Sequence, residues 1–343
     1  AVTANPPFFS TTMSLRQTLS EFYPPKPTFT DKDLEDLGGK VYLITGGTSG
    51  IGFILAKTLY SKNAKVYITS RSAASGEKAI SEIKESAASS HGELRYLVLD
   101  LGDLQTVVPA VKSFLAQETL LHTVWFNAGV MKVPSGSISK QGYELQWGTN
   151  VVGHFVVNKL LMPILLTTAQ VAPKGSVRVV WVSSDGHSLL SPKGDGIDWE
   201  DITTRKSEGW KGEKGSMTYY GQSKAGNVLL AMELAKRYGN EDIIGVSLNP
   251  GHLKTNLQRH SNSALAKRFE GLVLHDPSFG ALTELYAGFS DAIGTDNNGV
   301  YIIPWGRVGE IRQDIEAGFH HRGTGKKLWE ILEKETEEYV LTA

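Results

Sequence analysis

The chain has 343 residues, of which 41% are hydrophobic and 21% are charged, a composition typical of a globular domain rather than of a disordered chain. Its 35 Lys and Arg balance 36 Asp and Glu, so its charge gives no basis for a nucleic-acid or anionic-membrane partner. The absence of cysteine excludes disulfides, thiolate metal sites and a cysteine nucleophile.

The first 38 residues are expected to form an N-terminal arm. They are rich in Pro, Ser and Thr, and Pro24, Pro25 and Pro27 favour an extended backbone. The arm lacks the basic-then-apolar pattern of a secretory leader, so a cytoplasmic location is expected. The most apolar long stretch, residues 151–166, is interrupted by His, Asn, Lys and Pro, which predicts a buried helix rather than a membrane span.

From residue 39 onward, short apolar strands alternate with helical segments. This alternation predicts one Rossmann-type α/β domain over residues 39–343, in which helices cover both faces of a doubly wound parallel sheet in three α/β/α layers. Segments 185–215 and 252–275 are expected to be lids on the substrate side, and residues 328–339 a solvated helix. The other elements are expected as strands at 40–45, 64–69, 94–99, 123–126, 176–182 and 243–248, and helices at 51–59, 77–86, 105–116, 151–166 and 217–238.

A glycine-rich loop joins the first expected strand to the first expected helix. Residues 45–52 read Thr-Gly-Gly-Thr-Ser-Gly-Ile-Gly. Such glycines allow a tight turn and a close approach to a pyrophosphate, and the helix N-terminus offers it free N–H groups. No Gly-Lys-Ser/Thr follows, which excludes a P-loop. A plain turn is the alternative, but the position between strand and helix favours a dinucleotide site.

The end of the second expected strand bears on the type of dinucleotide. Rossmann domains specific for NAD carry an acid about 20 residues after the glycines, to bind the ribose 2′-hydroxyl. This chain has Ser70-Arg71-Ser72 there, and the Arg71 guanidinium can form two hydrogen bonds to a 2′-phosphate. We therefore predict NADP(H) in preference to NAD(H). An exposed arginine without a ligand is the alternative.

A Tyr-x-x-x-Lys pair stands in the long helix expected at 217–238. Tyr220 and Lys224 are one helical turn apart and therefore share a face. A phenol with its ordinary pKa of about 10 is a poor acid–base group at neutral pH. A nearby ammonium group would stabilise the phenolate and lower that pKa, which would make Tyr220 a usable proton donor or acceptor. Taken alone, the pair is common and more typical of an ordinary surface contact.

Taken together and in chain order, these motifs resemble the short-chain dehydrogenase/reductase family between about residues 39 and 251. The long spacing from Ser184 to Tyr220 resembles retinol-dehydrogenase-like members and fungal carbonyl reductases. Ser49 departs from many NADP-preferring relatives, which have a basic residue just before the second glycine of the pattern. The matching residues are Thr45, Gly46, Gly50 and Gly52, then Asp100, Asn127-Ala128-Gly129, Asn150, Ser184, Tyr220 with Lys224, and Asn249-Pro250-Gly251 with Thr255.

The resemblance implies a catalytic set of Ser184, Tyr220, Lys224 and Asn150. Ser184 and Tyr220 would hydrogen-bond the substrate oxygen, and Tyr220 would exchange the proton. Lys224 would lower the Tyr220 pKa and bind the nicotinamide ribose, and Asn150 would hold a water that links Lys224 to solvent. The residues expected to contact the dinucleotide are Gly46, Thr48, Ser49, Gly50, Ile51, Gly52, Arg71, Asp100, Leu101, Asn127, Ala128, Gly129, Tyr220, Lys224, Pro250, Gly251, Leu253 and Thr255.

The predicted activity is the reduction of a ketone or aldehyde to an alcohol, or the reverse. Two alternatives stay open: a dinucleotide-binding sensor or scaffold without turnover, and a lyase or isomerase that uses the same fold. The chain is expected to be a monomer or homodimer with a small-molecule partner. No metal site is expected, and His252 and the pair His320-His321 are interpreted as structural or surface residues.

Apolar side chains in the two expected lid segments favour an apolar or aromatic substrate. The same side chains would also serve to pack the lids against the domain, and the sequence supports both readings equally. The residues concerned are Leu189, Leu190, Trp199 and Trp210 in the first segment, and Leu253, Leu257, Phe269, Leu272 and Leu274 in the second.

Overall fold

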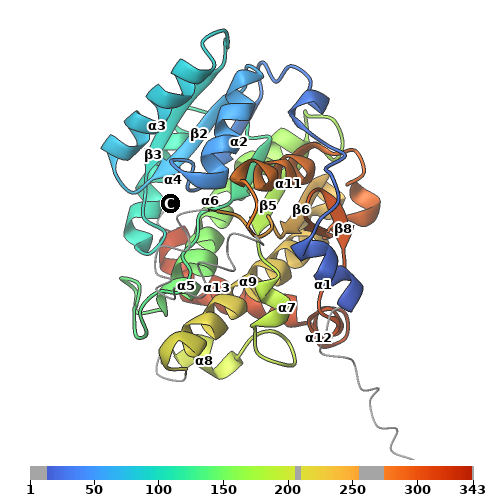
Figure 1. The fold of residues 1–343 in the computed structure, drawn as a ribbon. Helices are drawn as coiled ribbons and strands as arrows, with labels where there is room; N and C mark the ends of the chain where they lie inside the picture. The colour runs from blue at the N-terminus through green and yellow to red at the C-terminus, as the bar shows by residue number, and fades with distance from the viewer. Residues whose placement is uncertain (1–13, 205–209, 255–273, 342–343) are drawn as a thin grey trace, which may run out of the picture.

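The computed structural model describes residues 14–204, 210–254 and 274–341. Its strands are, in chain order, β1 (Val41–Ile44), β2 (Lys65–Ser70), β3 (Glu93–Val98), β4 (Thr123–Phe126), β5 (Val177–Val182), β6 (Ile243–Leu248), β7 (Tyr301–Ile303) and β8 (Arg307–Gly309). They form one sheet in the order β3-β2-β1-β4-β5-β6-β7-β8 (Figure 1). All neighbours pair in parallel except β7 and β8, which are antiparallel. The predicted Rossmann-type fold is therefore confirmed, and its sheet ends in a short antiparallel pair that the sequence analysis missed.

Helices cover both faces of this sheet. The α-helices are α1 (Leu15–Phe22), α2 (Gly50–Ser61), α3 (Ala73–Ser86), α4 (Leu104–Leu115), α5 (Leu145–Trp147), α6 (Gly153–Ala169), α7 (Gly186–Leu189), α8 (Trp199–Thr204), α9 (Gly212–Tyr238), α11 (Pro277–Phe289), α12 (Gln313–Ala317) and α13 (Thr324–Leu341). Short 3-10 or π segments are η1 (Asp31–Asp33), η2 (Gly148–Val152), η3 (Gly239–Glu241), η5 (Thr295–Asn297) and η6 (Gly318–Arg322). Helices α2, α3 and α11 form one layer, and α4, α6, α9 and α13 form the other.

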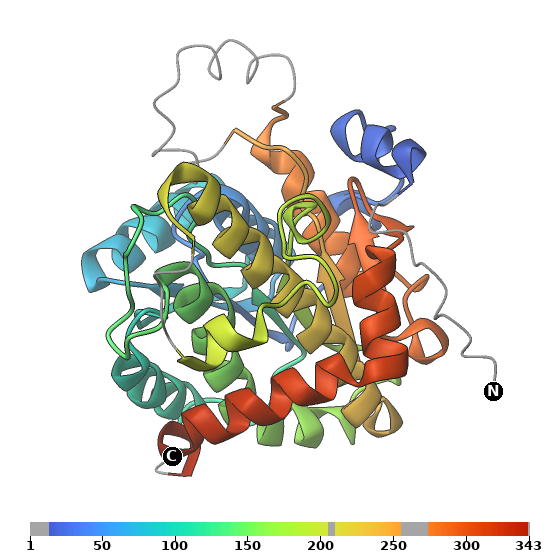
Figure 2. The same cartoon turned by 90° about the horizontal axis from the view of Figure 1, so that it is seen from below.

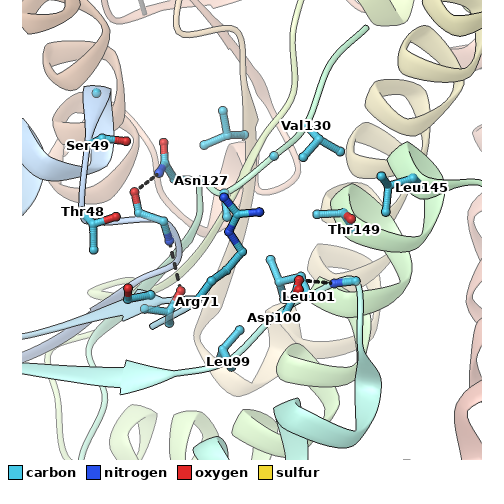
Figure 3. A pocket seen from close by; sticks show the side chains of 18 of the residues that line it. Thr48, Ser49, Arg71, Leu99, Asp100, Leu101, Asn127, Val130, Leu145 and Thr149 are labelled. Atoms are coloured by element: carbon cyan, nitrogen blue, oxygen red, sulfur yellow. Dashed lines mark hydrogen bonds between the residues drawn. The ribbon is translucent and has the colours of Figure 1, made fainter. Parts of the chain in front are cut away.

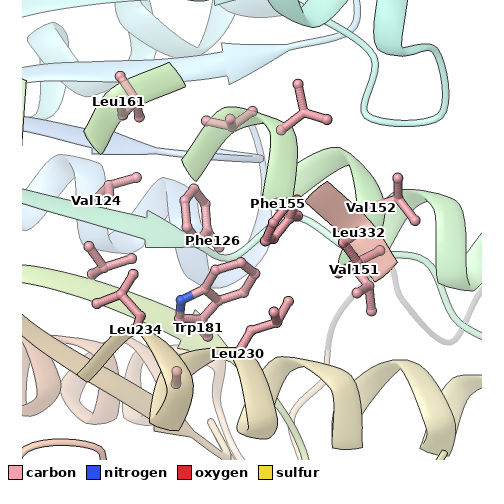
Figure 4. Close-up of a cluster of buried hydrophobic side chains, with 14 of the residues drawn as sticks. Val124, Phe126, Val151, Val152, Phe155, Leu161, Trp181, Leu230, Leu234 and Leu332 are labelled. Atoms are coloured by element: carbon pink, nitrogen blue, oxygen red, sulfur yellow. The ribbon is translucent and has the colours of Figure 1, made fainter. Parts of the chain in front are cut away.

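The central strands supply both layers of the core. Successive side chains of a strand point to opposite faces, so a strand covered on both sides is apolar throughout. In β4, Val124 and Phe126 join the cluster under α4, α6 and α9, whereas Trp125 joins the cluster under α2 and α11. Phe126 packs edge-on against Trp181 of β5, with ring centroids 4.5 Å apart (Figure 4).

One continuous helical stretch, Leu145–Ala169, is long and apolar enough to cross a membrane. It comprises α5, η2 and α6, and 78% of its most apolar window is buried inside the protein. It packs against α4, α13 and the sheet. The stretch is therefore a core helix, as the sequence analysis predicted for residues 151–166.

The N-terminal arm contains a helix that the sequence analysis did not predict. Ser14 caps α1 by accepting a hydrogen bond from the Gln17 N–H. The Gln17 amide bonds both backbone groups of Glu310, next to β8, with distances of 2.9 and 2.8 Å. This contact fixes α1 (blue) at the edge of the sheet near β8 (Figure 1). The buried side of α1 carries polar residues and Leu15 is exposed, so its pattern is the reverse of an ordinary amphipathic helix.

The C-terminal helix is not simply solvated, as had been expected. Leu328, Trp329, Leu332 and Thr336 of α13 are buried against α4, α6 and α9. Figure 2 shows α13 (red) lying along one side of the molecule beside α9. The charged residues in its sequence occupy the outer face, and the apolar ones extend the core.

Replacing Trp329 by alanine is expected to reduce the free energy of unfolding by about 3–5 kcal/mol. The Trp329 ring packs against Phe155, with centroids 5.1 Å apart, and the Arg237 guanidinium lies 4.9 Å from its centre. Urea unfolding would measure the loss. Glu330→Ala, on the exposed face of the same helix, is the control and should change the value by no more than about 0.5 kcal/mol. Equal losses in the two variants would contradict the buried placement of Trp329.

Candidate active site

A cavity of about 820 Å³ lies where the order of the sheet reverses, between β1 and β4. In open α/β sheets this crevice, outside the carboxyl ends of the strands, is the usual ligand site. Its size is within the range of small-molecule and cofactor sites. Residues that follow four neighbouring strands line it: Gly46 to Ile51 after β1, Arg71 after β2, Asp100 and Leu101 after β3, and Asn127 to Val130 after β4.

The glycine loop is shaped for close approach to a ligand. Gly46 has φ of +71°, and a Cβ there would lie 3.0 Å from Ala128. A Cβ at Gly52 would lie 2.5 Å from the Asn127 amide nitrogen, which donates to the Thr45 carbonyl at 2.8 Å. Ser49 begins α2 without capping it through its side chain, which leaves the first N–H groups of the helix available to an anion. The loop therefore fits a pyrophosphate.

Arg71 is exposed and extends into the cavity from the end of β2 (Figure 3). Asp100 lies on the neighbouring wall, where its carboxylate accepts a hydrogen bond from the Gly102 N–H at 2.9 Å. That bond orders the turn after β3. The Arg71 guanidinium and the turn at Asp100 therefore lie at the β2–β3 side of the cavity, away from Tyr220 on α9.

Asn150 ties the loop after β4 to the long helix. It is buried in the π segment η2, where its amide makes a two-way pair with the backbone of Val130, at 2.9 and 3.1 Å. The amide nitrogen also donates to the Ser223 hydroxyl of α9 at 3.0 Å. Both polar atoms of the Asn150 side chain are thus bonded to the protein, so the side chain bridges the loop after β4 and α9.

The adjacent serines after β5 differ in their contacts. The Ser183 hydroxyl donates to the backbone carbonyl of Lys224 at 2.8 Å and so anchors α9. The Ser184 hydroxyl donates to the Asp185 carboxylate at 2.9 Å and lies beside the Tyr220 phenol. The Lys224 ammonium donates to the Val182 carbonyl at 2.9 Å and lies 5.5 Å from the centre of the Tyr220 ring.

Burial dominates the ionisation of the tyrosine–lysine pair. It raises the pKa of Tyr220 well above its ordinary value; the neighbouring Ser184 hydroxyl opposes this rise and the charge of Asp185 adds to it. Burial also lowers the pKa of Lys224 to about 8. Desolvation thus raises the Tyr220 pKa, whereas the sequence analysis expected Lys224 to lower it. At neutral pH Tyr220 is a phenol and Lys224 is a cation.

With this geometry described, comparison with known proteins identifies the family. A model of short chain dehydrogenases matches residues 40–190. A short-chain dehydrogenase/reductase of Phomopsis amygdali is 42% identical, and the match covers 97% of this chain and 100% of that relative. The chain belongs to the short-chain dehydrogenase/reductase family.

Solved structures of similar fold agree with this membership. A protein of Mycobacterium paratuberculosis is 27% identical, has a TM-score of 0.65, and the match covers 90% of this chain and 97% of that one. The Pseudomonas aeruginosa protein RhlG, in a complex with NADP, is 23% identical with a TM-score of 0.58, over 78% of this chain and 95% of that one. At this identity the second likeness concerns the fold.

The cavity also draws on residues that the motifs did not indicate. Val130, Leu145 and Thr149 line it, together with the loop residues 138–140. A bridge between Ile138 and Glu144 folds this loop back on itself, and such an irregular loop has no periodic pattern by which to predict it. Of the predicted residues, Thr255 lies outside the described part of the chain, and those that do not line the cavity are Gly52, Asn150, Ser184, Gly251 and Leu253.

The apolar residues of the expected lids are mostly used in packing. The Trp210 and Tyr219 rings lie 4.7 Å apart, and the Lys327 ammonium lies 4.1 Å above the Trp199 ring. Leu189 is 52% exposed, and Leu253 is buried close to Gly280. Leu257, Phe269 and Leu272 lie outside the described residues. The contacts seen therefore match the packing alternative at least as well as a substrate role.

His252, which the sequence analysis interpreted as a structural or surface residue, lies close to the candidate catalytic residues. Its Nε2 lies 3.1 Å from a carboxylate oxygen of Asp185, next to Ser184. His320 and His321 are exposed on η6, as expected. Within residues 14–204, 210–254 and 274–341, no cluster of His and acidic residues could hold a metal ion.

Proposed function

We propose that this protein is an NADP(H)-dependent oxidoreductase that reduces a ketone or aldehyde to an alcohol, or catalyses the reverse reaction. The observation that carries the proposal is the convergence of Ser184, Tyr220 and Lys224 beside a cavity of dinucleotide size. Family membership supports it, and the relative RhlG has been solved with NADP. A bound nicotinamide dinucleotide would supply or accept the hydride.

Tyr220 is the proton donor in this proposal. Burial keeps it protonated at neutral pH, which is the state required to donate to a carbonyl oxygen as negative charge develops there. Ser184 helps to hold that oxygen. The Lys224 ammonium stabilises the phenolate that remains after the transfer. Asn150 fixes the backbone of Val130 at the cavity wall.

The cofactor would be held by the residues already placed around the cavity. The backbone of residues 46 and 48–51 would bind the pyrophosphate, and Arg71 would provide the cation for a 2′-phosphate. Asp100 and Leu101 stand where the adenine would lie, and Asn127 to Gly129, Lys224 and Pro250 stand on the nicotinamide side.

The first test is a spectrophotometric assay of NADPH and NADH oxidation with a panel of apolar, aromatic and short polar carbonyl compounds. The proposal predicts turnover with NADPH, and best with apolar or aromatic members of the panel. Preference for short polar sugars would reject the apolar class. Binding of NADPH without consumption by any carbonyl compound would favour the sensor, and a redox-neutral product would favour the lyase or isomerase.

The rate of reduction is expected to fall as pH rises through about 8. Burial lowers the pKa of Lys224 to about 8, so its ammonium is present below that pH and lost above it. Without the cation, the phenolate left on Tyr220 is less stable and proton donation is slower. A profile of kcat between about pH 6 and 10 measures this limb. A profile that stays flat through pH 8 would contradict the role of Lys224.

A monomer is the assembly that the fold supports best. The helices after Asn150 and through Tyr220 resemble those that pair subunits in this family, and α13 of the same chain covers α6 and α9. The surface of α6 and α9 that would pair subunits is thus covered by α13 of the same chain. Light scattering is expected to give the mass of a single chain, and a stable mass of two chains would contradict the proposal.

A further inference from the structure

The N-terminal helix α1 contacts the turn that follows β6. Glu21 is 1% exposed; one of its carboxylate oxygens accepts from the Asn249 amide at 2.7 Å and the other from the Gln17 amide at 2.9 Å. Asn249 in turn accepts from the Gly251 N–H at 2.9 Å. Glu21 therefore holds the Asn-Pro-Gly turn, whose Pro250 lines the cavity.

The next residue of α1 holds an imidazole. The Phe22 and His252 rings are stacked, with centroids 4.2 Å apart and planes inclined by 20°. The Phe22 carbonyl lies 3.2 Å from the His275 Nε2, which fixes this end of α1 from the other side. The Nε2 atom of the His252 ring lies 3.1 Å from a carboxylate oxygen of Asp185. His252 is thus clamped between the N-terminal helix and the segment after β5.

Asp185 connects that imidazole to the candidate catalytic residues. One of its oxygens faces His252, and the other accepts the hydrogen of the Ser184 hydroxyl. Ser184 lies beside the Tyr220 phenol and influences its pKa. A series of neighbouring side chains therefore leads from Phe22 of α1 to Tyr220, although α1 lies outside the stretch matched by the family model.

The charges along this series are set by the groups around it. Burial opposes ionisation of Asp185, but its contacts with His252 and Ser184 outweigh burial and hold its pKa below the usual range. Burial alone would lower the pKa of His252, and the Asp185 contact and the charge of Glu21 reverse this and raise it. Burial raises the pKa of Glu21 to about 7.

The other titratable groups nearby do not replace His252 as a counter-charge. Burial lowers the pKa of His187, which lies beside Ser184 and Asp185, to about 4, so it is neutral at pH 7. Burial raises the pKa of Tyr301 far above its ordinary value, so it is uncharged. The Arg312 guanidinium is paired with Asp314. Among the described groups that face Asp185, His252 is therefore the cation that compensates its charge.

We propose that Asp185 and His252 are positioning residues that set the charge beside Ser184 and Tyr220, and that α1 holds this pair in place through Glu21 and Phe22. The kinetic part of this proposal rests on the proposed oxidoreductase function, whereas the pairing itself does not. With His252 protonated, the Asp185 charge is balanced and disfavours the Tyr220 phenolate less. Without His252, an unbalanced carboxylate faces the phenol and disfavours phenolate formation.

Titration of the His252 ring by NMR tests the pairing without any turnover. The full chain carries ¹³C-labelled histidine, and the Cε1–Hε1 signal of His252 is assigned by its loss in His252→Gln. The midpoint is expected above the usual 6.5, and lower by about one pH unit in Asp185→Asn. Glu21→Gln should lower it by less, and Glu316→Gln, an exposed acid on α12, should leave it unchanged. A midpoint that does not respond to Asp185→Asn overturns the proposal.

The pH profile of kcat/KM for alcohol oxidation tests the effect on Tyr220, because oxidation requires the phenolate. The rising limb is expected to move to higher pH in His252→Gln and to lower pH in Asp185→Asn, each by about half a unit, and to return near the wild-type position in the double variant. A merely structural role would scale the rate without moving the limb in opposite directions, and that result overturns the proposal. If the wild-type protein oxidises no alcohol and reduces no carbonyl compound, the proposed function fails, and the NMR titration alone decides the pairing.

Discussion

Replacing Tyr220 by phenylalanine is expected to reduce kcat for carbonyl reduction by about 10²–10⁴-fold, because the variant lacks the proton donor. The ring and its packing are retained, so NADPH affinity should change by less than about threefold. The buried phenol lies beside Ser184 and near the Lys224 ammonium. Steady-state NADPH oxidation and the quenching of protein fluorescence by NADPH measure the two quantities separately.

Tyr219→Phe is the matched control for this substitution. Tyr219 is the preceding residue of α9, and its hydroxyl donates to the Asp201 carboxylate at 3.2 Å rather than to Ser184. Its loss should leave kcat within about threefold of the wild-type value. If Tyr220→Phe kept a tenth or more of the activity, or if the two variants were equally impaired, the assignment of Tyr220 as proton donor would be wrong.

Replacing Arg71 by alanine is expected to raise the Kd of NADPH by about 10–100-fold and to change that of NADH by less than about threefold. A hydrogen bond to a charged group contributes about 1.5–3 kcal/mol, and about 1.4 kcal/mol corresponds to a factor of ten. Arg71 is the cation at the end of β2, and Ser49 supplies no second charge from the glycine loop. Calorimetric titration with both dinucleotides measures the difference.

A second variant separates a local contact from a change in net charge. Lys78→Ala removes a cation from the exposed face of α3, where the side chain is 78% accessible, and should leave both affinities unchanged. Equal weakening of NADPH and NADH by Arg71→Ala would mean that Arg71 does not contact a 2′-phosphate. Tighter binding of NADH than of NADPH by the wild-type protein would reverse the cofactor proposal.

Much of the fold was predictable because its central strands are buried on both faces. Such strands are short apolar runs, and β4 spans the four residues that the sequence predicted. The Tyr220–Lys224 pair was also predictable, since a helical spacing of four residues places both on one face. The glycine loop followed from its position between a strand and a helix.

The parts that were not predicted depend on contacts between distant segments. Helix α1 is short and buries Gln17 and Glu21 against the edge of the domain, so its sequence lacks an apolar stripe. Strands β7 and β8 have only three residues each, too few to show a period. The role of α13 was misjudged because its charged residues outnumber the apolar ones that fill the core.

The pKa shifts and charge pairs of the site could not be predicted from residue types alone. The sequence indicated an ammonium near the phenol, but the degree of burial that raises the Tyr220 pKa is a property of the folded chain. His252 was dismissed because no metal-like partners stand near it in the sequence. Its partner, Asp185, comes from the end of a different strand, and only the parallel pairing of β5 with β6 brings the two together.

The most direct test of hydride transfer is a reduction carried out with NADPH deuterated at C4 of the nicotinamide, on each face in turn. The account predicts that one of the two labelled cofactors places a single deuterium on the carbinol carbon of the product, with one NADPH oxidised per alcohol formed. Mass spectrometry of the product measures the label. A product without deuterium from either cofactor, or one formed while NADPH is not consumed, would contradict the account and make a redox-neutral reaction on this fold the better explanation.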